Sequence, residues 1–600
     1  MLSTVKNLGD YVSKKDGLST ESMFMQSSKI EDVKNVLCIN FESKKDSIAY
    51  KNVFISRYNP SDYARYLYRI HPHQRYDVTP TSRMGNPEKT RKRFELWFET
   101  ISGEYLKDPL LYHLRKEFLD KISHIFDDVT DKYKNIDQES RRNTIITITI
   151  EEGIVKYLGD YDIFRRILKD EASRGFHFKH DVEARGEGMC FLCKRKREVF
   201  GFGSPFSFYT FDKRGFAPNF LREDAWKSLP LCISCCVALS AGKNFINKYL
   251  NRRFYGFNFF ILPSFILGFN DEIIEEIRSP KKNYSTLLCR EDNISEIIAE
   301  SNSLVNLTFV FIKPKQSDYF DIMRYIEYVP PSWIKRISEE RKSVLAGSIF
   351  GESFLKQVFG KKWVGTFDDK SDATLGGLVR DFFPRSKIEG IYDKYFLDII
   401  GDMLAQRRIR LSLLMDAFSE AIRNAFRKNT RTDDWKMRIL ALKSLGLVLL
   451  LRRLKIVELG EGILSSDLTE SGKELFTPFF KEYGDAFGTP DKRAAFLEGV
   501  LAKYLMDVQY ADRESTPFRE KLYGLRLDER RIKKLFPEIL EKLREYKVTY
   551  TALEQEAARA FVEAGKYGWK LSNGETSYFF ALGMTLAPVF KMKNARDDEE

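Results

Sequence analysis

The pattern of apolar and polar positions changes along the chain. The first part mixes strand-like and helix-like patterns, whereas the second part keeps only the helical one. In the first part, β-branched and aromatic runs bounded by turn residues predict strands, most clearly NTIITITIEEG at residues 143–153. FYGFNFFILP and NLTFVFIKP predict two more strands, which we expect to stop at Pro263 and Pro314. Apolar residues three and four apart predict helices at YARYLYRI and EKTRKRFELWFETI. The first part is therefore expected to mix helices and strands.

After Trp333 the helical period dominates, and no comparable strand run follows. KYFLDIIGDMLAQRRIRLSLLMDAFSEAIRNAF, which ends at Phe426, repeats its apolar residues at three and four. The proline pair in YVPPSW, residues 328–333, predicts a domain boundary, and ELGEGILSSDLTESG predicts a second one. The pattern as a whole predicts an α+β protein whose second half consists mainly of helices packed as antiparallel bundles.

The composition is that of a folded protein with several domains. The chain has 600 residues, of which 43% are hydrophobic, 14% aromatic and 31% charged, and this length predicts two to four domains. The N-terminal stretch MLSTVKNLGDYVSKKDG lacks the apolar core of a secretory signal. The most apolar stretches are interrupted by Pro263 or are too short to cross a bilayer. We therefore expect a cytoplasmic protein without a membrane partner, in which clustered cysteines hold metal rather than form disulfides.

Five of the seven cysteines lie in two short stretches, MCFLCKRKREVF and LPLCISCCVALSAGKNF. Cys190 and Cys193 form one CxxC pair, and Cys232 and Cys235 form another. Two such pairs complete a tetrahedral shell of four sulfurs that suits Zn²⁺ and leaves no open position, so we expect a structural ion. An iron–sulfur cluster would use the same ligands, and Cys236 is an alternative to Cys235. Buried free thiols are the remaining interpretation of the two pairs.

The other cysteines and the length of chain between the pairs complete this prediction. Cys38 and Cys289 stand alone and are expected to be small core residues. The residues between the two pairs are more numerous than a minimal zinc ribbon needs, so a small subdomain is expected there. The sequence thus predicts a zinc-ribbon-like subdomain inserted in the mixed N-terminal domain.

Positive charge is concentrated in one segment of the second half. The chain has 98 Lys and Arg against 86 Asp and Glu, which gives a net charge of +12, and residues 405–455 alone carry +9. Concentrated positive charge suits a polyanion, although a solvated helical face would have the same composition. Arg407 with Arg410, and Arg423 with Arg427, would share helix faces opposite a buried apolar face. The residues predicted to contact phosphates here are Arg407, Arg408, Arg410, Arg423, Arg427 and Lys428.

Two basic loops in the first half are further candidates for nucleic-acid contact. SRMGNPEKTRKRF places basic residues beside Gly85 and Asn86, and its candidate residues are Arg83, Asn86, Lys89, Arg91, Lys92 and Arg93. The second loop lies between the cysteine pairs, where Lys213 and Arg214 precede Gly215. An exposed loop that binds nothing and a loop that seals the subdomain are the alternatives to nucleic-acid contact.

The chain lacks the short motifs of several enzyme classes. The sequence contains no GxxxxGK[ST], HExxH or GxSxG, and its carboxylates form no recognisable nuclease set. We therefore expect a binding subunit and no catalytic residues. The alternatives are a zinc-containing nucleic-acid enzyme such as a metal-dependent nuclease, and a scaffold that binds protein alone.

The region between the cysteine pairs resembles a known family. A CxxC, an aromatic turn FYTFDKRGF and then WKSLPLCISC are similar to the large subunit of type I-B CRISPR interference (Cascade) complexes, in the Csh-one branch. The stretches FLEGVLAKYLMDVQ, TPFREKLYGLRLDERRIKKLFPEILEKLREY and SYFFALGM resemble the helical end of those proteins. The resemblance runs from about Lys179 to the C-terminus, and the first 150 residues fit it loosely.

The resemblance implies a function and a set of partners. Such a subunit recognises a protospacer-adjacent motif on duplex DNA, aids strand separation, stabilises the R-loop and recruits a separate helicase–nuclease. Its partners are guide RNA, target double-stranded DNA, the displaced single strand, and the backbone and other subunits of the complex. The resemblance also implies that the helical half ends in a bundle like the small subunit. The predicted domains are a mixed α/β part at 1–180, a four-cysteine zinc subdomain at 181–245, the remaining strands at 246–335, a basic helical domain at 336–465 and a helical bundle at 466–600.

Overall fold

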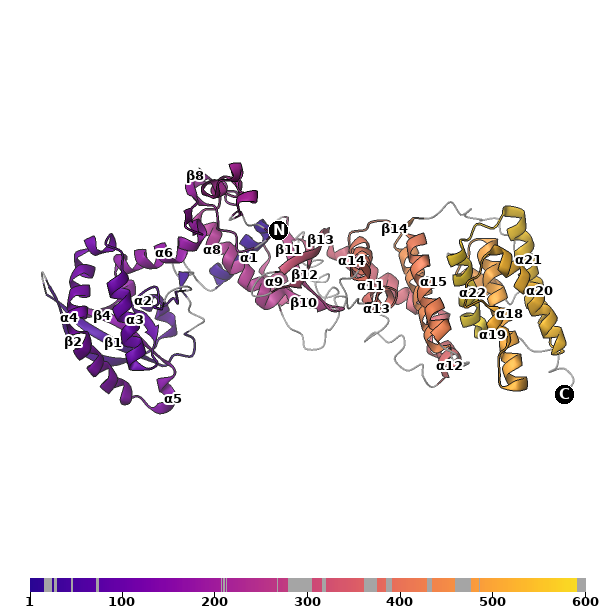
Figure 1. The fold of residues 1–600 in the computed structure, drawn as a ribbon, viewed down its shortest axis with the longest axis horizontal. Helices are drawn as coiled ribbons and strands as arrows, with labels where there is room; N and C mark the ends of the chain where they lie inside the picture. Colours follow the sequence, from indigo (N-terminus) through magenta and orange to yellow (C-terminus); the bar gives the residue numbers. More distant parts are fainter. Residues whose placement is uncertain are drawn as a thin grey trace. The chain divides into compact units, whose positions relative to one another are not determined.

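The computed structural model has two compact units, Met1–Tyr249 and Leu250–Glu600 (Figure 1). The five-part division predicted above is finer than this one and stays a prediction. The structure describes residues 1–15, 24–25, 30–44, 47–71, 75–206, 208, 211, 213–266, 268–278, 305–315, 320–360, 375–384, 391–428, 434–458, 476–484 and 486–590.

A mixed sheet forms the centre of the first unit. Its strand order is β2-β1-β4-β3, and β5 also pairs with β4. β1 and β4 run parallel, with Asn35 opposite Thr144, and the other pairs are antiparallel. Residues 144–150 of β4 are all buried, as expected for a central strand covered on both faces. The strands are β1 (Asn35–Lys44), β2 (Ser47–Arg57), β3 (Thr81–Arg83), β4 (Thr144–Glu152) and β5 (Ile154–Tyr157).

Helices between β3 and β4 supply the core that covers this sheet. α4 packs against β2 and against α3. The ring centroids of Phe98 and Phe118 lie 4.5 Å apart, and the Phe94 ring stacks on Phe118 at 6.1 Å. The predicted helix at residues 88–101 is confirmed as α3. The helices of this unit are α1 (Leu2–Lys15), α2 (Tyr63–Tyr66), α3 (Pro87–Thr100), α4 (Pro109–Lys134), α5 (Gln138–Arg141), α6 (Asp162–His177), α7 (Ala225–Ser228) and α8 (Ile233–Phe245).

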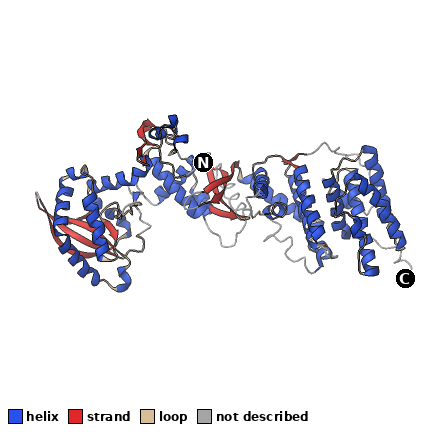
Figure 2. Cartoon of the chain, in the orientation of Figure 1, coloured by secondary structure: helices blue, strands red, loops and turns tan. Residues whose placement is uncertain are grey.

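The second unit begins with an antiparallel sheet and continues as helices (Figure 2). The sheet has the order β10-β11-β12-β13, and α14 packs against β13. Arg324 on β13 bonds Asp398 and Asp402 of α14, each at 2.9 Å, which fixes the helix to the sheet. These elements are β10 (Asn251–Phe254), β11 (Phe257–Phe265), β12 (Val305–Pro314), β13 (Phe320–Val329) and α14 (Ile391–Leu404).

The helices after this sheet pack closely enough to need glycine where they cross. A Cβ at Gly499 of α18 would lie 2.0 Å from the Phe580 carbonyl oxygen, and one at Gly583 of α22 would lie 1.9 Å from the Phe496 oxygen. The expected helical second half is confirmed, and the protein is mixed α+β. The helices are α9 (Asp271–Arg278), α11 (Pro331–Leu345), α12 (Glu352–Phe359), α13 (Leu375–Arg380), α15 (Leu411–Lys428), α16 (Trp435–Arg453), α17 (Thr477–Glu482), α18 (Pro490–Arg513), α19 (Phe518–Lys521), α20 (Glu529–Glu545), α21 (Thr551–Tyr567) and α22 (Asn573–Leu586).

Two local predictions were wrong. β11 continues through Pro263 to Phe265, because β10 pairs only with residues 257–260 and, among the strands that the structure describes, none pairs with that edge of β11 at Pro263. The helix predicted at residues 63–70 ends after Tyr66, because Leu67 takes a left-handed conformation with φ 48°. In the described part of the chain, no helix has the length and apolarity needed to span a membrane.

Candidate metal centre and basic surfaces

The first cysteine pair lies in the turn of a β-hairpin. β8 (Arg185–Met189) and β9 (Lys196–Phe200) are antiparallel, and the loop between them carries Cys190 and Cys193. The Lys194 amide donates to the Cys190 carbonyl oxygen at 3.0 Å, and Lys194 has a left-handed φ of 57°. This tight turn brings the two side chains of the pair to the same side of the loop.

The second pair lies at the start of α8 rather than in a turn of its own. Cys232 is the residue just before the helix, and Cys235 is in its first turn. The Phe200 amide donates to the Leu231 oxygen at 2.8 Å, and the Phe191 amide donates to the Pro230 oxygen at 2.7 Å. These backbone bonds place the helix start beside the hairpin turn. The positive end of the helix dipole there favours a thiolate.

Helix α8 is held in position by α1, which it touches through the backbone. A Cβ at Gly9 of α1 would lie 1.9 Å from the Ala238 oxygen, and one at Gly242 of α8 would lie 2.0 Å from the Val5 oxygen. Glycine is required at both positions because any side chain would push the helices apart. The N-terminal helix α1 therefore supports α8, whose start carries Cys232 and Cys235.

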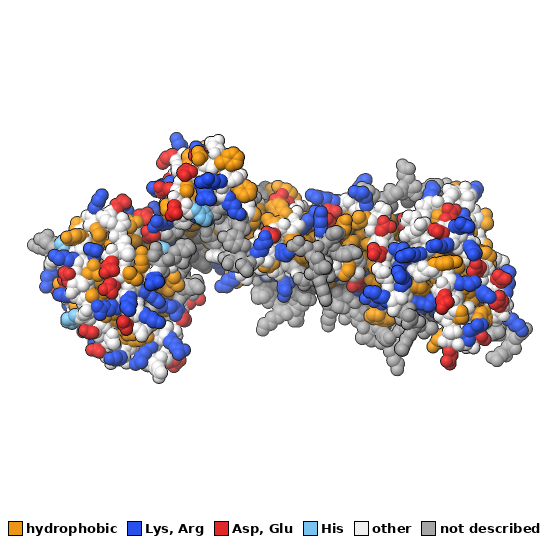
Figure 3. All heavy atoms as spheres, in the orientation of Figure 1, with side chains coloured by type: hydrophobic (Ala, Val, Ile, Leu, Met, Phe, Trp, Pro, Cys, Tyr) orange, Lys and Arg blue, Asp and Glu red, His pale blue; other side chains and the backbone are white. Residues whose placement is uncertain are grey.

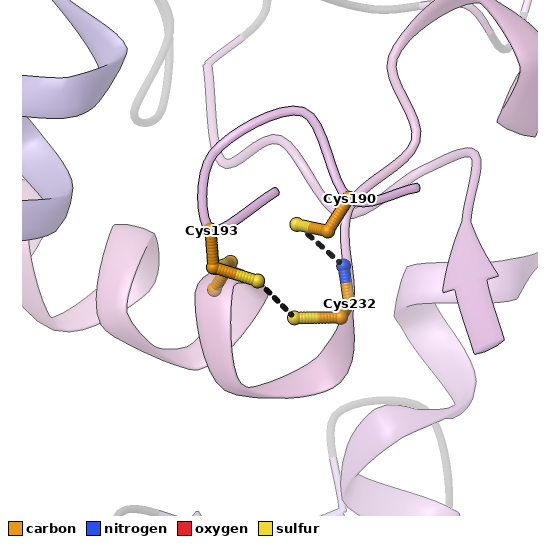
Figure 4. Close-up of side chains that lie close together, drawn as sticks. Cys190, Cys193 and Cys232 are labelled. Atoms are coloured by element: carbon orange, nitrogen blue, oxygen red, sulfur yellow. Dashed lines mark hydrogen bonds between the residues drawn. The ribbon is translucent and has the colours of Figure 1, made fainter. Parts of the chain in front are cut away.

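The four sulfurs form one cluster, and Figure 4 labels three of its residues, Cys190, Cys193 and Cys232. All four lie within 4.8 Å of one another, and the sulfurs of Cys193 and Cys232 are 3.7 Å apart. Tetrahedral Zn²⁺ with Zn–S bonds of about 2.3 Å requires sulfurs about 3.8 Å apart. Cys190, Cys232 and Cys235 are buried, whereas Cys193 is half-buried. The cluster thus fits a metal ion bound by four thiolates, without showing which metal.

The electrostatics of the cluster favour ionisation of one thiol over its neighbour. A hydrogen bond from the Cys235 thiol, supported by one from Ser234, lowers the pKa of Cys232 to about 4, although burial opposes this. The same hydrogen bond to Cys232, together with burial, raises the pKa of Cys235. The Cys232 amide also donates to the Cys190 sulfur at 3.4 Å. Thiolates are the metal-binding form, and the hydrogen bonds that Cys232 receives favour that form at this position.

The structure selects Cys235 rather than Cys236 for the cluster. Cys236 is fully buried, and its thiol donates to the Leu231 oxygen at 3.7 Å. A Cβ at Gly203 would lie 2.1 Å from the Cys236 sulfur, so this side chain packs against the preceding loop. Cys38 is fully buried as predicted, and burial raises its pKa to about 12. Cys289 lies outside the described residues.

Two residues of the first basic loop, Asn86 and Arg83, have structural roles. Asn86 caps α3, and its side-chain oxygen accepts hydrogen bonds from the Glu88 amide at 2.9 Å and the Lys89 amide at 3.2 Å. Arg83 forms an ion pair with Asp32. Among the other candidates, Lys89 and Lys92 are exposed, and Arg91 and Arg93 are half-buried. The loop therefore presents Lys89 and Lys92 to solvent, while the side chains of Arg83 and Asn86 have partners within the protein.

The second basic loop is open to solvent. Lys213 and Arg214 are both exposed, and a Cβ at Gly215 would meet nothing within 4 Å. The space around Gly215 would allow a ligand to approach the backbone closely.

The basic segment at 405–455 does not form one helical stripe. Arg423, Arg427 and Lys428 lie on α15, and the first two share a face. Arg407, Arg408 and Arg410 lie between α14 and α15, and Arg410 belongs to the two-residue strand β14 (Ile409–Arg410). The prediction that Arg407 and Arg410 share a helix face was wrong, because the chain leaves the helix to pair with β15 (Val457–Glu458).

Part of the charge in this segment is neutralised inside the protein. Lys443, only 2% exposed, donates to Asp381 at 2.5 Å. Asp434 pairs at 2.6 Å with Arg519, which also stacks over the Phe426 ring at 3.7 Å. Lys428 and Lys443 line a groove of about 770 Å³ together with Trp435. Among the described residues of this segment, the exposed basic side chains are those of Arg407, Arg408, Arg410, Arg427, Lys428, Lys436, Arg453 and Lys455.

Family models place the chain among known proteins. Three models of one family, the CRISPR-associated protein TM1802, match its N-terminal domain to residues 1–170, its central domain to 187–329 and its C-terminal domain to 375–598. The chain belongs to the CRISPR-associated TM1802 family. No curated protein matches it in sequence. The four-cysteine cluster falls in the part matched to the TM1802 central domain.

Sequence reasoning missed two features of this TM1802-family chain. The first is Trp226, whose ring packs against the hairpin: a Cβ at Gly186 would lie 2.6 Å from it, and it contacts the apolar cluster of the four cysteines. The second is the exposure of Phe216, Phe220 and Leu221 in the loop between the pairs. The available signal was Gly215 just before these apolar residues and Pro218 between them, in a stretch that follows no helical or strand period.

Proposed function

We propose that this chain is the non-catalytic large subunit of a type I-B RNA-guided interference complex. In this role it recognises a protospacer-adjacent motif on duplex DNA, aids strand separation and stabilises the R-loop. A separate helicase–nuclease, recruited by the complex, cuts the DNA. The observation that carries the proposal is the match of all three domains of one CRISPR-associated family along the chain.

The exposed basic groups support nucleic-acid contact in both units. Lys89, Lys92 and Lys213 in the first unit are exposed, as are Arg407 and Lys428 in the second. Lysine and arginine supply the affinity for phosphates, which is independent of sequence. The proposal assigns the motif to the first basic loop and the phosphate backbone of the strands to the second unit.

We further propose that the four-cysteine cluster holds one structural Zn²⁺. Cys190, Cys193, Cys232 and Cys235 would hold the ion, which would join the hairpin turn to the start of α8. Four thiolates fill a tetrahedral shell, so no position remains for a reacting water. When bound, zinc supplies folding energy to the subdomain and no chemistry. An iron–sulfur cluster on the same ligands would give visible absorption and a stoichiometric iron content, which distinguishes the two.

The decisive experiment reconstitutes the complex with its guide RNA, with and without this chain. Duplex targets that match the guide are presented with a library of flanking sequences, and bound targets are sequenced. The proposal expects a short flanking motif to be enriched only when this chain is present. An enrichment that is unchanged without the chain, or no flanking preference at all, contradicts it.

Asn86 offers a sharper test of motif reading, because its role as a helix cap can be separated from base contact. Asn86→Asp keeps the oxygen that caps α3 but loses the side-chain N–H donors. If Asn86 reads a base edge, this variant should keep its melting temperature and lose preference for the motif, at about 1–3 kcal/mol per contact. Asn86→Ala, which also removes the cap, is the matched variant and should be less stable by about 1 kcal/mol. If the Asn86→Asp variant keeps its full preference for the motif, Asn86 does not contact the bases of the motif.

The non-catalytic part of the proposal is tested with the purified chain. Incubation with duplex and single-stranded DNA in Mg²⁺ or Mn²⁺ should leave both intact, and cleavage by the complex should begin only when the helicase–nuclease is added. Cleavage that co-elutes with the chain through a second column would favour the metal-dependent nuclease instead.

A further inference from the structure

Large apolar side chains gather on the surface of the four-cysteine subdomain. Phe216 is 63% exposed, Phe220 is 72% exposed and Leu221 is 53% exposed. In the hairpin, Met189 and Phe191 are exposed as well. All five residues lie between positions 189 and 221. Because their side chains are exposed, they do not serve to fill the cysteine cluster or a hydrophobic core. We call residues 213–222 the aromatic turn.

The backbone of the aromatic turn holds these rings outward. It consists of short 3₁₀ turns, Arg214–Phe216 and Pro218–Phe220, with Ala217 buried between them. Asn219 and Phe220 have left-handed φ angles of 54° and 60°. A bulky residue in this conformation is strained and persists only where the surrounding structure imposes it. The most exposed ring of the turn thus lies at its most strained position.

Positive charge accompanies the exposed rings. Lys213 and Arg214 are exposed at the start of the aromatic turn. In the hairpin, the Lys194 ammonium lies over the Phe191 ring at 4.8 Å from its centroid. Hydrophobic and basic side chains are both exposed on the small lobe that carries β8, with acidic side chains among them (Figures 1 and 3). Lysine is depleted in protein–protein interfaces, so the lysines beside these rings, Lys194 and Lys213, favour a nucleic-acid partner.

We propose that the aromatic turn is a stacking platform for unpaired bases of a single nucleic-acid strand. Exposed aromatic rings bind bases through their faces, and neighbouring cations bind the phosphates between them. Phe216 and Phe220 supply the rings, and Lys213 and Arg214 supply the charge. The proposal shares with the proposed function the premise that the chain binds nucleic acid, and it adds a site for unpaired bases that is separate from motif reading on duplex DNA.

The test measures binding of the full-length, metal-loaded chain to three probes: oligothymidylate, oligouridylate and a DNA duplex. Phe216→Ala and Phe220→Ala should each weaken single-strand binding about 5- to 150-fold, the range expected for one lost base–aromatic stack. Binding to the duplex should change less than twofold. Phe220→Trp should retain the affinity, whereas Phe220→Leu, which stays apolar but cannot stack, should lose it. The two oligonucleotides distinguish a DNA strand from an RNA strand as the natural ligand.

Tyr112→Ala is the matched control, because Tyr112 is an exposed aromatic residue on α4, 51% exposed and outside the subdomain. It should bind all probes as the wild type does. Several results overturn the inference: no binding of either oligonucleotide, alanine variants that bind normally, or a leucine variant as good as the tryptophan variant. Alanine variants that lose only their association with other subunits would identify a protein-docking surface instead. Motif enrichment in the reconstituted complex is measured separately, so failure of this site and failure of the proposed function give different results.

Discussion

Replacing Cys193 with serine should release the metal and leave most of the chain folded. Cys193 is the least buried of the four ligands, so the substitution disturbs packing less than any other in the cluster. Cys236→Ser is the matched control. It makes the same atomic change at a fully buried sulfur next to Cys235 but outside the cluster.

The expected magnitudes separate the two variants. Structural zinc sites in small peptides contribute about 10–16 kcal/mol of folding free energy, or about 2.5–4 kcal/mol per ligand if four share it equally. Loss of one ligand should therefore weaken zinc binding about 100- to 1,000-fold. Cys236→Ser leaves a buried hydroxyl in place of a thiol, which costs about 1–3 kcal/mol of stability. It removes no ligand, so zinc affinity should not change.

Two measurements test this. Metal analysis should give about one zinc per chain for the wild type and for Cys236→Ser, and well below one for Cys193→Ser after dialysis against a mild chelator. Hydrogen exchange should show faster exchange of the β8–β9 hairpin amides in Cys193→Ser. The β1–β4 sheet belongs to the core of the same unit and carries none of the four cluster cysteines, so its exchange should be unchanged. We expect the variant to be poorly soluble as well, since the apolar residues around the cluster become exposed.

The reasoning fails if Cys193→Ser retains a full equivalent of zinc through chelation, because the ion would then have other ligands. It also fails if the wild type is free of metal and the hairpin amides are nevertheless protected. In that case the backbone bonds to Leu231 and Pro230 would hold the subdomain without an ion.

Three further outcomes are expected. Asp434→Ala should destabilise the second unit by about 3–5 kcal/mol in denaturant unfolding, since it removes the carboxylate that forms the ion pair with the largely buried guanidinium of Arg519; a loss below about 1 kcal/mol would contradict this. Arg423→Ala with Arg427→Ala should weaken DNA binding on all sequences alike and reduce the salt slope by about one unit per lost phosphate contact; a changed motif preference would reverse the assignment. Cys38, whose pKa burial raises to about 12, should resist iodoacetamide at neutral pH while the protein is folded.

Periodicity and spacing sufficed for the features that depend on neighbouring residues. β4 and α3 were recognised because their side-chain periods are set by the local backbone. The four-cysteine cluster was recognised for a similar reason: a CxxC spacing brings two sulfurs together whether it lies in a hairpin turn or at a helix start. Metal coordination tolerates either context, so the prediction did not depend on knowing which one was present.

Features that depend on distant partners could not be read from the sequence. Arg407 and Arg410 follow a helical period, but pairing of β14 with β15, far along the chain, takes them off the helix. The charge of residues 405–455 was counted correctly, yet Lys443 and Asp434 are paired inside the fold, because their partners Asp381 and Arg519 come from other elements.

The sequence by itself determined that this chain is an α+β protein with a helical second half and a thiolate cluster, since each follows from local geometry. Only the tertiary structure decided that α8 holds half of the cluster while backed by α1, because two helices can touch through glycine only where the fold brings them together. It also decided that Asn86 caps a helix and that Phe220 faces solvent. A polar or aromatic side chain can bind a ligand only if the fold leaves it accessible. Its neighbours in the fold come from distant parts of the chain, so local sequence does not reveal them.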